Sequence, residues 1–316
     1  MTDSTPDLGV KIGPLRLKNP VLAASGTFGY GREYEDLFDP ARLGGIIVKG
    51  LSLRPRAGNP PPRIVETPCG MLNAIGLANV GVERFLEEKL PRLRGLDTVV
   101  IANIYGHSME EYGDVAGALR GVEGIDALEV NISCPNVAQG GMAFGTDPLA
   151  SARVTEKVLS RSDKPVIVKL SPNVTDIREP ARAVVSAGAQ AVSLINTVTG
   201  MVVDVERRTP VLANVTGGLS GPAIRPIAVR MVHEVVHAVD VPVVGGGGIM
   251  TARDALEFLI TGARAVEVGT ASFVDPEAML KIVEGLSSFC RTHRVNRVQE
   301  LIGTLRIQGG DSGSVP

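Results

Sequence analysis

A chain of 316 residues with 44% hydrophobic and 21% charged residues can form one large barrel or two ordinary domains, and it has the composition of a soluble, core-forming protein. A net charge of -2, the absence of Trp and an aromatic content of 3% argue against a nucleic-acid-binding surface. The polar, acidic N-terminus and the lack of a long apolar run predict a cytoplasmic protein without a membrane span.

The first predicted element is a small β-hairpin over residues 10–20, where apolar and polar side chains alternate around Gly13-Pro14. We expect this hairpin to cap one end of the main fold. From there a short β-branched run followed by a helical segment repeats about eight times, which predicts a parallel sheet with helical crossovers. Eight parallel strands favour a closed (β/α)8 TIM barrel over an open doubly wound sheet.

The repeat defines the elements in chain order. The predicted strands are 21–25, 45–49, 99–103, 128–133, 166–170, 191–196, 241–245 and 265–269. The predicted helices are 82–93, 109–119, 148–159, 177–187, 222–239, 252–260 and 276–290. We expect a single barrel domain over residues 1–306, followed by a polar, glycine-rich and disordered tail over residues 307–316.

Nearly every predicted strand ends in or near a polar residue or a glycine. These positions include Ser25, Lys49, Asn103, Asn131, Lys169, Asn196, Gly246 and Thr270. In a barrel they converge on the carboxyl-terminal rim, where barrel enzymes place their chemistry. A single asparagine at such a point is often turn punctuation. A lysine inside an apolar run, such as Lys49 or Lys169, needs an anionic partner, so these two lysines point to function.

A single thiol, Cys134, lies between two asparagines in the stretch Asn131-Ile132-Ser133-Cys134-Pro135-Asn136. Pro135 cannot donate a backbone hydrogen bond and biases the preceding residue toward extended geometry, so the strand is expected to stop at the thiol. The almost uncharged, glycine-rich stretch 137–148 is long for a strand-to-helix connection and predicts a lid. The pattern fits a nucleophile or base, although an isolated Cys often acts as a small buried hydrophobe.

Glycine-rich segments follow the last two predicted strands, at Gly245–Gly248 and at Gly269-Thr270. Backbone without side chains lets peptide N–H groups approach phosphate oxygens, so we expect a phosphate-bearing ligand here. The first run is not a dinucleotide fingerprint, because it opens no Rossmann unit and no acidic residue follows at ribose-binding spacing. A third glycine-rich segment, 216–222, could close round the same phosphate or be a flexible loop.

One motif in the sequence is typical of a different kind of site, a zinc site. His233-Glu234-Val235-Val236-His237 matches the zinc-protease pattern, with Glu257 downstream as a candidate third ligand. In the barrel assignment the two histidines lie on an outer crossover helix and Glu257 on the next helix, away from the rim. We therefore predict solvated helix residues and no metal site.

With these residues laid out, the chain resembles the catalytic subunit of the NAD-linked, class 1B dihydroorotate dehydrogenases over about residues 10–271. The segments that carry the resemblance are 24–29, 48–50, 70–77, 131–136, 168–173 and 217–221. The resemblance implies a flavoprotein barrel that oxidises dihydroorotate to orotate with hydride transfer to FMN, in de novo pyrimidine (UMP) biosynthesis.

The resemblance also assigns the site residue by residue. It implies that FMN contacts Ser25, Lys49, Gly50, Asn103, Asn131, Lys169, Ile195, Gly221, Gly247, Gly248, Gly269 and Thr270. It implies that substrate contacts Lys49, Asn73, Ala74, Ile75, Gly76, Leu77, Asn131, Asn136, Asn196 and Thr197. Cys134 then acts as general base, Lys49 holds the substrate carboxylate, and Lys169 stabilises negative charge on the reduced flavin. We assign Cys69 to packing.

FMN reduced by dihydroorotate must pass its electrons to another protein or molecule. Three cysteines at separated positions give no disulfide framework and no iron–sulfur or zinc site of the chain's own. The class 1B resemblance implies a partner subunit with FAD and a 2Fe–2S cluster that passes electrons to NAD, and a homodimer core within a heterotetramer. Two alternatives stay open: a fumarate-linked class 1A enzyme, which also uses a Cys base, and a non-redox phosphate-binding barrel.

Overall fold

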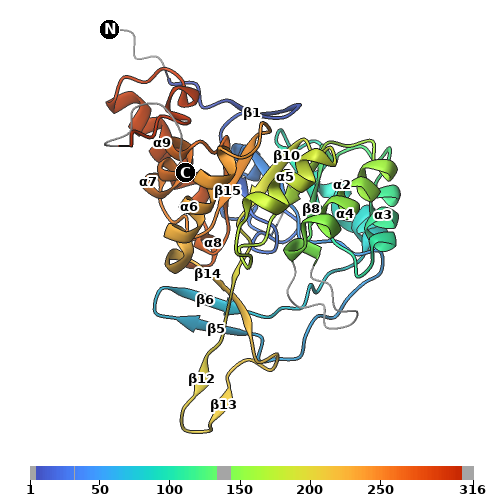
Figure 1. Cartoon of the computed structure of the whole chain (residues 1–316). Helices are drawn as coiled ribbons and strands as arrows, with labels where there is room; N and C mark the ends of the chain where they lie inside the picture. The colour runs from blue at the N-terminus through green and yellow to red at the C-terminus, as the bar shows by residue number, and fades with distance from the viewer. Residues whose placement is uncertain (1–4, 32, 134–143, 308–316) are drawn as a thin grey trace.

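Eight parallel strands close into a barrel with helices around it in the computed structural model, which describes residues 5–31, 33–133 and 144–307 (Figure 1). The strands are β3 (Val21–Ala23), β4 (Gly45–Ile47), β7 (Val99–Ile104), β8 (Ala127–Asn131), β9 (Val166–Lys169), β10 (Ala191–Leu194), β15 (Val243–Gly246) and β16 (Ala265–Val268). Their near-continuous aliphatic sequences suit strands that are buried on both faces. The predicted (β/α)8 barrel is confirmed.

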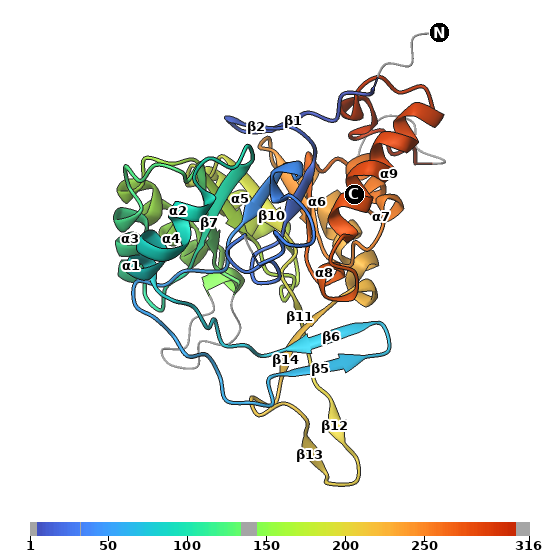
Figure 2. The same cartoon turned by 180° about the vertical axis from the view of Figure 1, so that it is seen from behind.

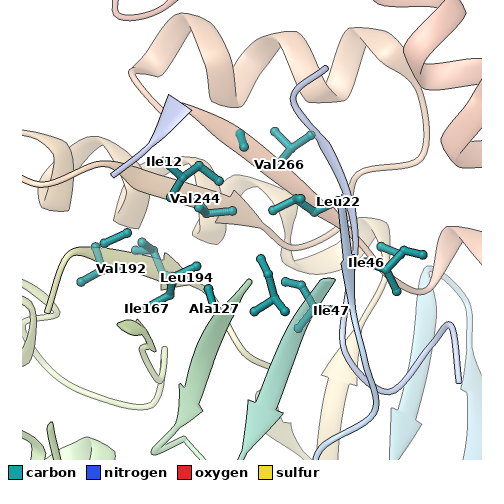
Figure 3. Packing of buried hydrophobic residues seen from close by; sticks show 14 of the residues in the cluster. Ile12, Leu22, Ile46, Ile47, Ala127, Ile167, Val192, Leu194, Val244 and Val266 are labelled. Carbon is teal, nitrogen blue, oxygen red and sulfur yellow. The ribbon is translucent and has the colours of Figure 1, made fainter. Parts of the chain in front are cut away.

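The N-terminal hairpin closes one end of this barrel. Strands β1 (Val10–Ile12) and β2 (Leu15–Leu17) pair antiparallel, with their apolar side chains buried and their charged side chains exposed. Ile12 packs among the barrel side chains with Val244 and Val266 (Figure 3). The turn residue Gly13 lies against the carbonyl of Gln190, just before β10 begins, so the hairpin covers the amino-terminal ends of the strands. The opposite end is left for a site.

Helices cover the outside of the barrel. They are α1 (Val82–Arg84), α2 (Leu90–Leu93), α3 (Met109–Ala118), α4 (Pro148–Arg161), α5 (Arg178–Ser186), α6 (Arg225–Val236), α7 (Ala252–Thr261), α8 (Ala271–Val274) and α9 (Ala278–Thr292). Short 3-10 helices occur at Pro40–Arg42, Phe144–Thr146, Pro222–Ile224 and Val298–Leu301. The predicted elements therefore occur close to their expected bounds.

The predicted helix 82–93 is not one regular α-helix. A π-helical turn, Phe85–Lys89, separates α1 from α2, and the N–H of Leu90 bonds to the carbonyl of Phe85. Pro91 follows at once and has no N–H for the carbonyl four residues earlier. The wider turn accommodates that missing donor.

A second, four-stranded antiparallel sheet lies at the open end of the barrel, away from β1 and β2 (Figure 2). Its strands are β5 (Ile64–Thr67), β6 (Gly70–Asn73), β11 (Val198–Gly200) and β14 (Gly217–Ser220), and a hairpin of β12 (Val203–Asp204) and β13 (Thr209–Pro210) extends beyond it. The sequence did not predict this sheet. The glycine-rich segment 216–222, expected either to close round the phosphate or to be a flexible loop, contains β14. Glycine is required there because a Cβ at Gly218 would overlap the side chain of Thr197.

A buried hydrogen-bond network holds the segment after β6 against the barrel. Asn79 Nδ2 lies 2.7 Å from the hydroxyl of Tyr105 and 2.8 Å from the carbonyl oxygen of Leu77, and Asn79 Oδ1 accepts from the N–H of Gly81 at 2.8 Å. The carbonyl of Leu77 also accepts from the Tyr105 hydroxyl at 3.0 Å. Leu77 has a left-handed φ of 57°, which is unfavourable for a bulky residue, so the network holds it in a conformation it would otherwise leave.

We expect Asn79→Ala to lower the free energy of unfolding by about 2–4 kcal/mol, because it leaves buried polar partners without hydrogen bonds. Urea denaturation followed by circular dichroism measures this loss. As a control, Asn214→Ala removes an exposed amide from the second sheet region and should change stability by less than about 0.5 kcal/mol. Equal losses in the two variants would contradict the role given to Asn79.

Candidate active site

A cavity of about 300 Å³ opens at the carboxyl-terminal ends of the barrel strands, between the barrel and the second sheet. It is lined by every residue that the sequence predicted to contact a cofactor: Ser25, Lys49, Gly50, Asn103, Asn131, Lys169, Ile195, Gly221, Gly247, Gly248, Gly269 and Thr270. Strand ends far apart in the sequence thus meet at one site, as the barrel geometry requires.

Most of the predicted substrate residues line the same cavity. Besides Lys49 and Asn131, these are Asn73, Ile75, Gly76, Leu77, Asn196 and Thr197. Ala74 does not line it, because its side chain is buried on the other side of the segment with Leu72 and Leu212. Cys134, Asn136 and most of the predicted lid, which includes residues 137–143, lie outside the described residues.

Glycines bring two backbone segments close together at one end of the cavity. Gly248 has a φ of 76°, and a Cβ there would come within 2.8 Å of both the carbonyl oxygen of Gly221 and the Cβ of Arg225. Beside them the hydroxyl of Thr270 donates to the hydroxyl of Ser220 at 2.8 Å. Backbone without side chains next to hydroxyl groups leaves room for an anionic group such as a phosphate.

Amide side chains line another part of the cavity. Asn196 Nδ2 donates to Asn131 Oδ1 at 3.3 Å, and Asn73 Nδ2 donates to the carbonyl of Gly218 at 3.4 Å. Both bonds are long, so these groups can also bond to a ligand. The hydroxyl of Tyr112 donates to the backbone carbonyl of Asn131 at 2.7 Å and fixes the end of β8. An amide offers both a donor and an acceptor, which suits a planar ligand that alternates the two.

A cluster of charges is buried inside the barrel below the cavity, and only one of its three charged residues, Lys169, was identified from the sequence. Lys169 Nζ lies 3.6 Å from Glu129 Oε1 and also pairs with Glu267 Oε2. Asn103 Nδ2 donates to Glu129 Oε2 at 2.6 Å, and Ser193 Oγ donates to Glu129 Oε1 at 2.7 Å. The sequence indicated that Lys169 needs an anionic partner. The sequence carried the same signal for Glu129 and Glu267 as for Lys169, because each is a charged residue inside an apolar strand.

The surroundings shift the pKa of each of these groups. Desolvation opposes the charge on Lys169, but the fields of Glu129 and Glu267 outweigh it and raise the pKa of the ammonium. Desolvation also opposes the charge on Glu129, but Lys169 and the donated hydrogen bonds outweigh it and lower the pKa of this carboxyl. Desolvation and repulsion by Glu129 raise the pKa of Glu267 to about 8. These shifts favour the charged forms of Lys169 and Glu129 and the neutral form of Glu267.

Lys49 lines the cavity as a second, half-buried cation. Burial lowers the pKa of its ammonium, and repulsion by Arg63 lowers it further. A negatively charged ligand in the cavity would stabilise this charge, so Lys49 is suited to bind a carboxylate.

The other sequence features lie away from the cavity. His233 and His237 are on and just after α6, where His237 Nδ1 lies 2.7 Å from the carbonyl oxygen of His233. Across the described ranges, no group of three His, Cys, Asp or Glu side chains could hold a metal ion, and no helix is long and apolar enough to cross a membrane. Cys69 is exposed in the turn between β5 and β6, where it packs against no core of the described residues, so its assignment to packing was wrong.

Comparison with known proteins adds independent information. The sequence profile of the family described as dihydroorotate dehydrogenase matches residues 7–290. Proteins named dihydroorotate dehydrogenase B (NAD(+)), catalytic subunit, are similar over nearly their full length. The one from Geotalea daltonii is 58% identical over 302 residues, which are 96% of this chain and 99% of that protein. The one from Geotalea uraniireducens is 59% identical over 300 residues, 95% of this chain and 98% of that protein.

A relative of the same name from Geobacter sulfurreducens is 55% identical over 96% of this chain and 99% of its own length. Identity at this level over almost the whole chain, together with the profile match and the eight-stranded barrel, leaves no room for a different family. This chain is a member of the dihydroorotate dehydrogenase family of oxidoreductases.

Proposed function

We propose that this chain catalyses the reaction of its family, the oxidation of dihydroorotate to orotate in pyrimidine biosynthesis, with FMN bound in the cavity at the barrel mouth. The observation that carries the proposal is the composition of that one cavity. A glycine-lined end suited to phosphate, a buried Lys169 and a group of amides beside Lys49 all line it. No simpler phosphate ligand needs all three features.

The residues of the cavity fit FMN. Gly221, Gly247, Gly248 and Thr270 would hold the phosphate, and Lys169 would lie toward the electron-rich part of the ring system. Asn103 Oδ1 is buried without a hydrogen-bond partner within the part of the chain that the structure describes, so a ligand N–H would satisfy it. FMN, when bound, supplies the hydride acceptor for the oxidation.

Dihydroorotate is a cyclic ureide that carries a carboxylate, and the rest of the cavity suits both parts. Lys49 would bind the carboxylate, since a charge-assisted hydrogen bond in a buried site is stronger than one between neutral groups. Asn73, Asn131 and Asn196 would bind the alternating donors and acceptors of the ring edge. The network around Asn79 supports this arrangement by holding Leu77 and its neighbours in the cavity wall.

Cys134 is the proposed general base. Its Sγ would take a proton from the substrate methylene group while a hydride leaves the neighbouring carbon that carries the carboxylate. Lys169, held between Glu129 and Glu267, is a fixed cation that stabilises negative charge developing nearby in a site with little water.

The electrons would leave through a partner subunit. The relatives are named as catalytic subunits of an NAD-dependent enzyme, which favours the class 1B assignment for this chain. We propose that two copies of the chain form a homodimer core and that each binds a subunit with FAD and a 2Fe–2S cluster, which gives a heterotetramer. The fumarate-linked class 1A reaction and a non-redox phosphate-binding barrel are the alternatives that an experiment must separate.

Experiments on the purified chain can distinguish the class 1B enzyme, the class 1A enzyme and the non-redox phosphate-binding barrel. The proposed function predicts a yellow protein whose flavin absorbance bleaches when dihydroorotate is added without oxygen, and slow or no reoxidation by fumarate. Efficient turnover with fumarate would favour class 1A. A colourless protein that binds inorganic phosphate but cannot take up FMN would overturn the flavin assignment.

We expect Gly248→Ala to lose most of its bound FMN, because the added methyl group would collide with Gly221 and Arg225, displace the glycine-lined end of the cavity and strain a left-handed residue. Flavin absorbance relative to protein absorbance measures the FMN content after purification. Gly95→Ala is the matched control, since Gly95 has a similar φ of 85° but its Cβ would meet nothing within 4 Å. If both variants kept FMN equally well, the glycines would not form the phosphate site.

We expect Cys134→Ser to keep its FMN spectrum and to lose about 10²–10⁴-fold in kcat/KM at pH 7, because a neutral hydroxyl is a poor base. In the unchanged protein the rate should rise with pH toward the pKa of a free thiol, ~8.5, as the thiolate forms. Anaerobic reduction of the flavin by dihydroorotate in a stopped-flow instrument measures the step. Cys69→Ser should leave the rate unchanged, and full activity of Cys134→Ser would rule out the assignment.

A further inference from the structure

The charge cluster inside the barrel contains more acid than base. Glu267 on β16 reaches across the barrel interior to Lys169 on β9, although β10 and β15 separate these two strands in the sheet. Glu129 on β8 approaches the same ammonium from the neighbouring strand. Asn103 on β7 and Ser193 on β10 complete the group with neutral donors. Two carboxyl groups thus share one buried cation.

Ionising both carboxyl groups would leave an uncompensated negative charge in the barrel. Glu129 is 0% exposed, Glu267 is 5% exposed and Lys169 is 7% exposed, so water screens that charge poorly. An unpaired charge in such surroundings is too costly to persist, and one of the two carboxyl groups must hold a proton.

The hydrogen bonds indicate which of the two carboxyl groups holds the proton. Both oxygens of Glu129 accept from side-chain donors, which favours its charged form. Glu267 accepts from Lys169 through its Oε2, but its Oε1 is buried and has no hydrogen-bond partner within the described part of the chain. A proton on Glu267 removes its charge and lets it donate a hydrogen bond to Glu129, which two ionised carboxylates cannot do. The raised pKa of Glu267, about 8, has the same cause: burial first, then repulsion by Glu129.

We propose that Glu267 is a positioning residue that stays protonated in the FMN-bound protein, so that FMN binding takes up a proton at this residue in alkaline solution. The proposal rests on the proposed function, because it takes FMN as the ligand of the cavity. Glu267 lines that cavity, so a bound ring system would remove its last contact with water. The ammonium of Lys169 would also interact with the ligand, so it would stabilise an ionised Glu267 less. Both effects make an ionised Glu267 less favourable in the complex than in the free protein.

The direction of the pH dependence follows from linkage. Below pH of about 8, Glu267 is protonated with or without FMN, so its titration does not change the affinity. Above that pH the free protein loses the proton and the complex keeps it, so the dissociation constant of FMN should rise by up to about tenfold per pH unit. The other charged or titratable groups of the cavity and cluster are Lys49, Lys169 and Glu129, and Cys134 follows β8.

The same group affects the stability of the protein without FMN. The pKa of Glu267 is raised by folding from 4.5 to about 8, so between these values the folded chain holds a proton that the unfolded chain has released. The free energy of unfolding should therefore fall as the pH rises through this window. Glu267→Gln, which imitates the protonated side chain, should remove this contribution.

The test is an FMN titration of the full chain at pH 7 to 9.5, a range in which the phosphate of FMN is fully ionised because its second pKa is about 6. Flavin fluorescence gives the dissociation constant, and a pH indicator in weakly buffered solution gives the protons taken up for each FMN bound. For the unchanged chain we expect a rising dissociation constant above pH of about 8 and uptake of up to about one proton.

Glu267→Gln should lose both the rise of the FMN dissociation constant above pH of about 8 and the proton uptake, whatever its dissociation constant at pH 7. Glu83→Gln, an exposed residue of α1, should keep the behaviour of the unchanged chain. Contributions from Lys49 and Cys134 are common to all three proteins and cancel in the comparison.

The outcomes separate the two proposals. If FMN binds at pH 7 but its dissociation constant stays level to pH 9.5, or if proton uptake is equal in the unchanged chain and in Glu267→Gln, this inference is overturned and the flavin assignment stands. If FMN does not bind at pH 7, the proposed function fails and the inference fails with it. Should Glu267→Gln not fold, proton uptake by the unchanged chain decides: no uptake at pH 8.5 to 9 overturns the inference.

Discussion

One ammonium group, that of Lys169, makes a charged interior possible in this barrel. The surrounding strands are aliphatic and fully buried, so neither Glu129 nor an anionic ligand could be held there without a cation. Lys169 can compensate both negative charges because it is the last residue of β9, where the packed interior of the barrel meets the cavity. The same side chain thus contacts the structural charge cluster below and the candidate cofactor site above.

The cavity itself depends on two sheets built on different principles. The parallel barrel brings strand ends from the whole chain to one rim, and these carry Lys49, Asn131 and the glycines. The antiparallel sheet adds a wall from the side, with Asn73 on β6 and Gly218 on β14. The barrel thus supplies the residues suited to a cofactor, and the added sheet supplies much of the wall where a smaller substrate would bind.

The sequence predicted the barrel and the rim well, because both follow from local patterns. A repeated strand-then-helix alternation indicates a barrel, and a polar residue at each strand end indicates a rim. The central strand of the second sheet, β14, could not be predicted, because half of its residues are glycine and it pairs with β6, which lies far away in the chain, so no local propensity marks it. Glu129 and Glu267 each stood out as a charge inside an apolar strand, but only the fold shows that both reach Lys169.

The barrel closes where its first strand in the sequence, β3, pairs with its last, β16. β16 pairs with β3, so Val266 and Val21 are register partners although nearly the whole sequence lies between them. During synthesis on the ribosome, β3 emerges early and must wait for β16 with one edge unpaired. Exposed strand edges attract other strands, and such distant contacts form slowly. A nascent chain that stops short of β16 cannot close the ring, so it would be a natural target for chaperones or proteases.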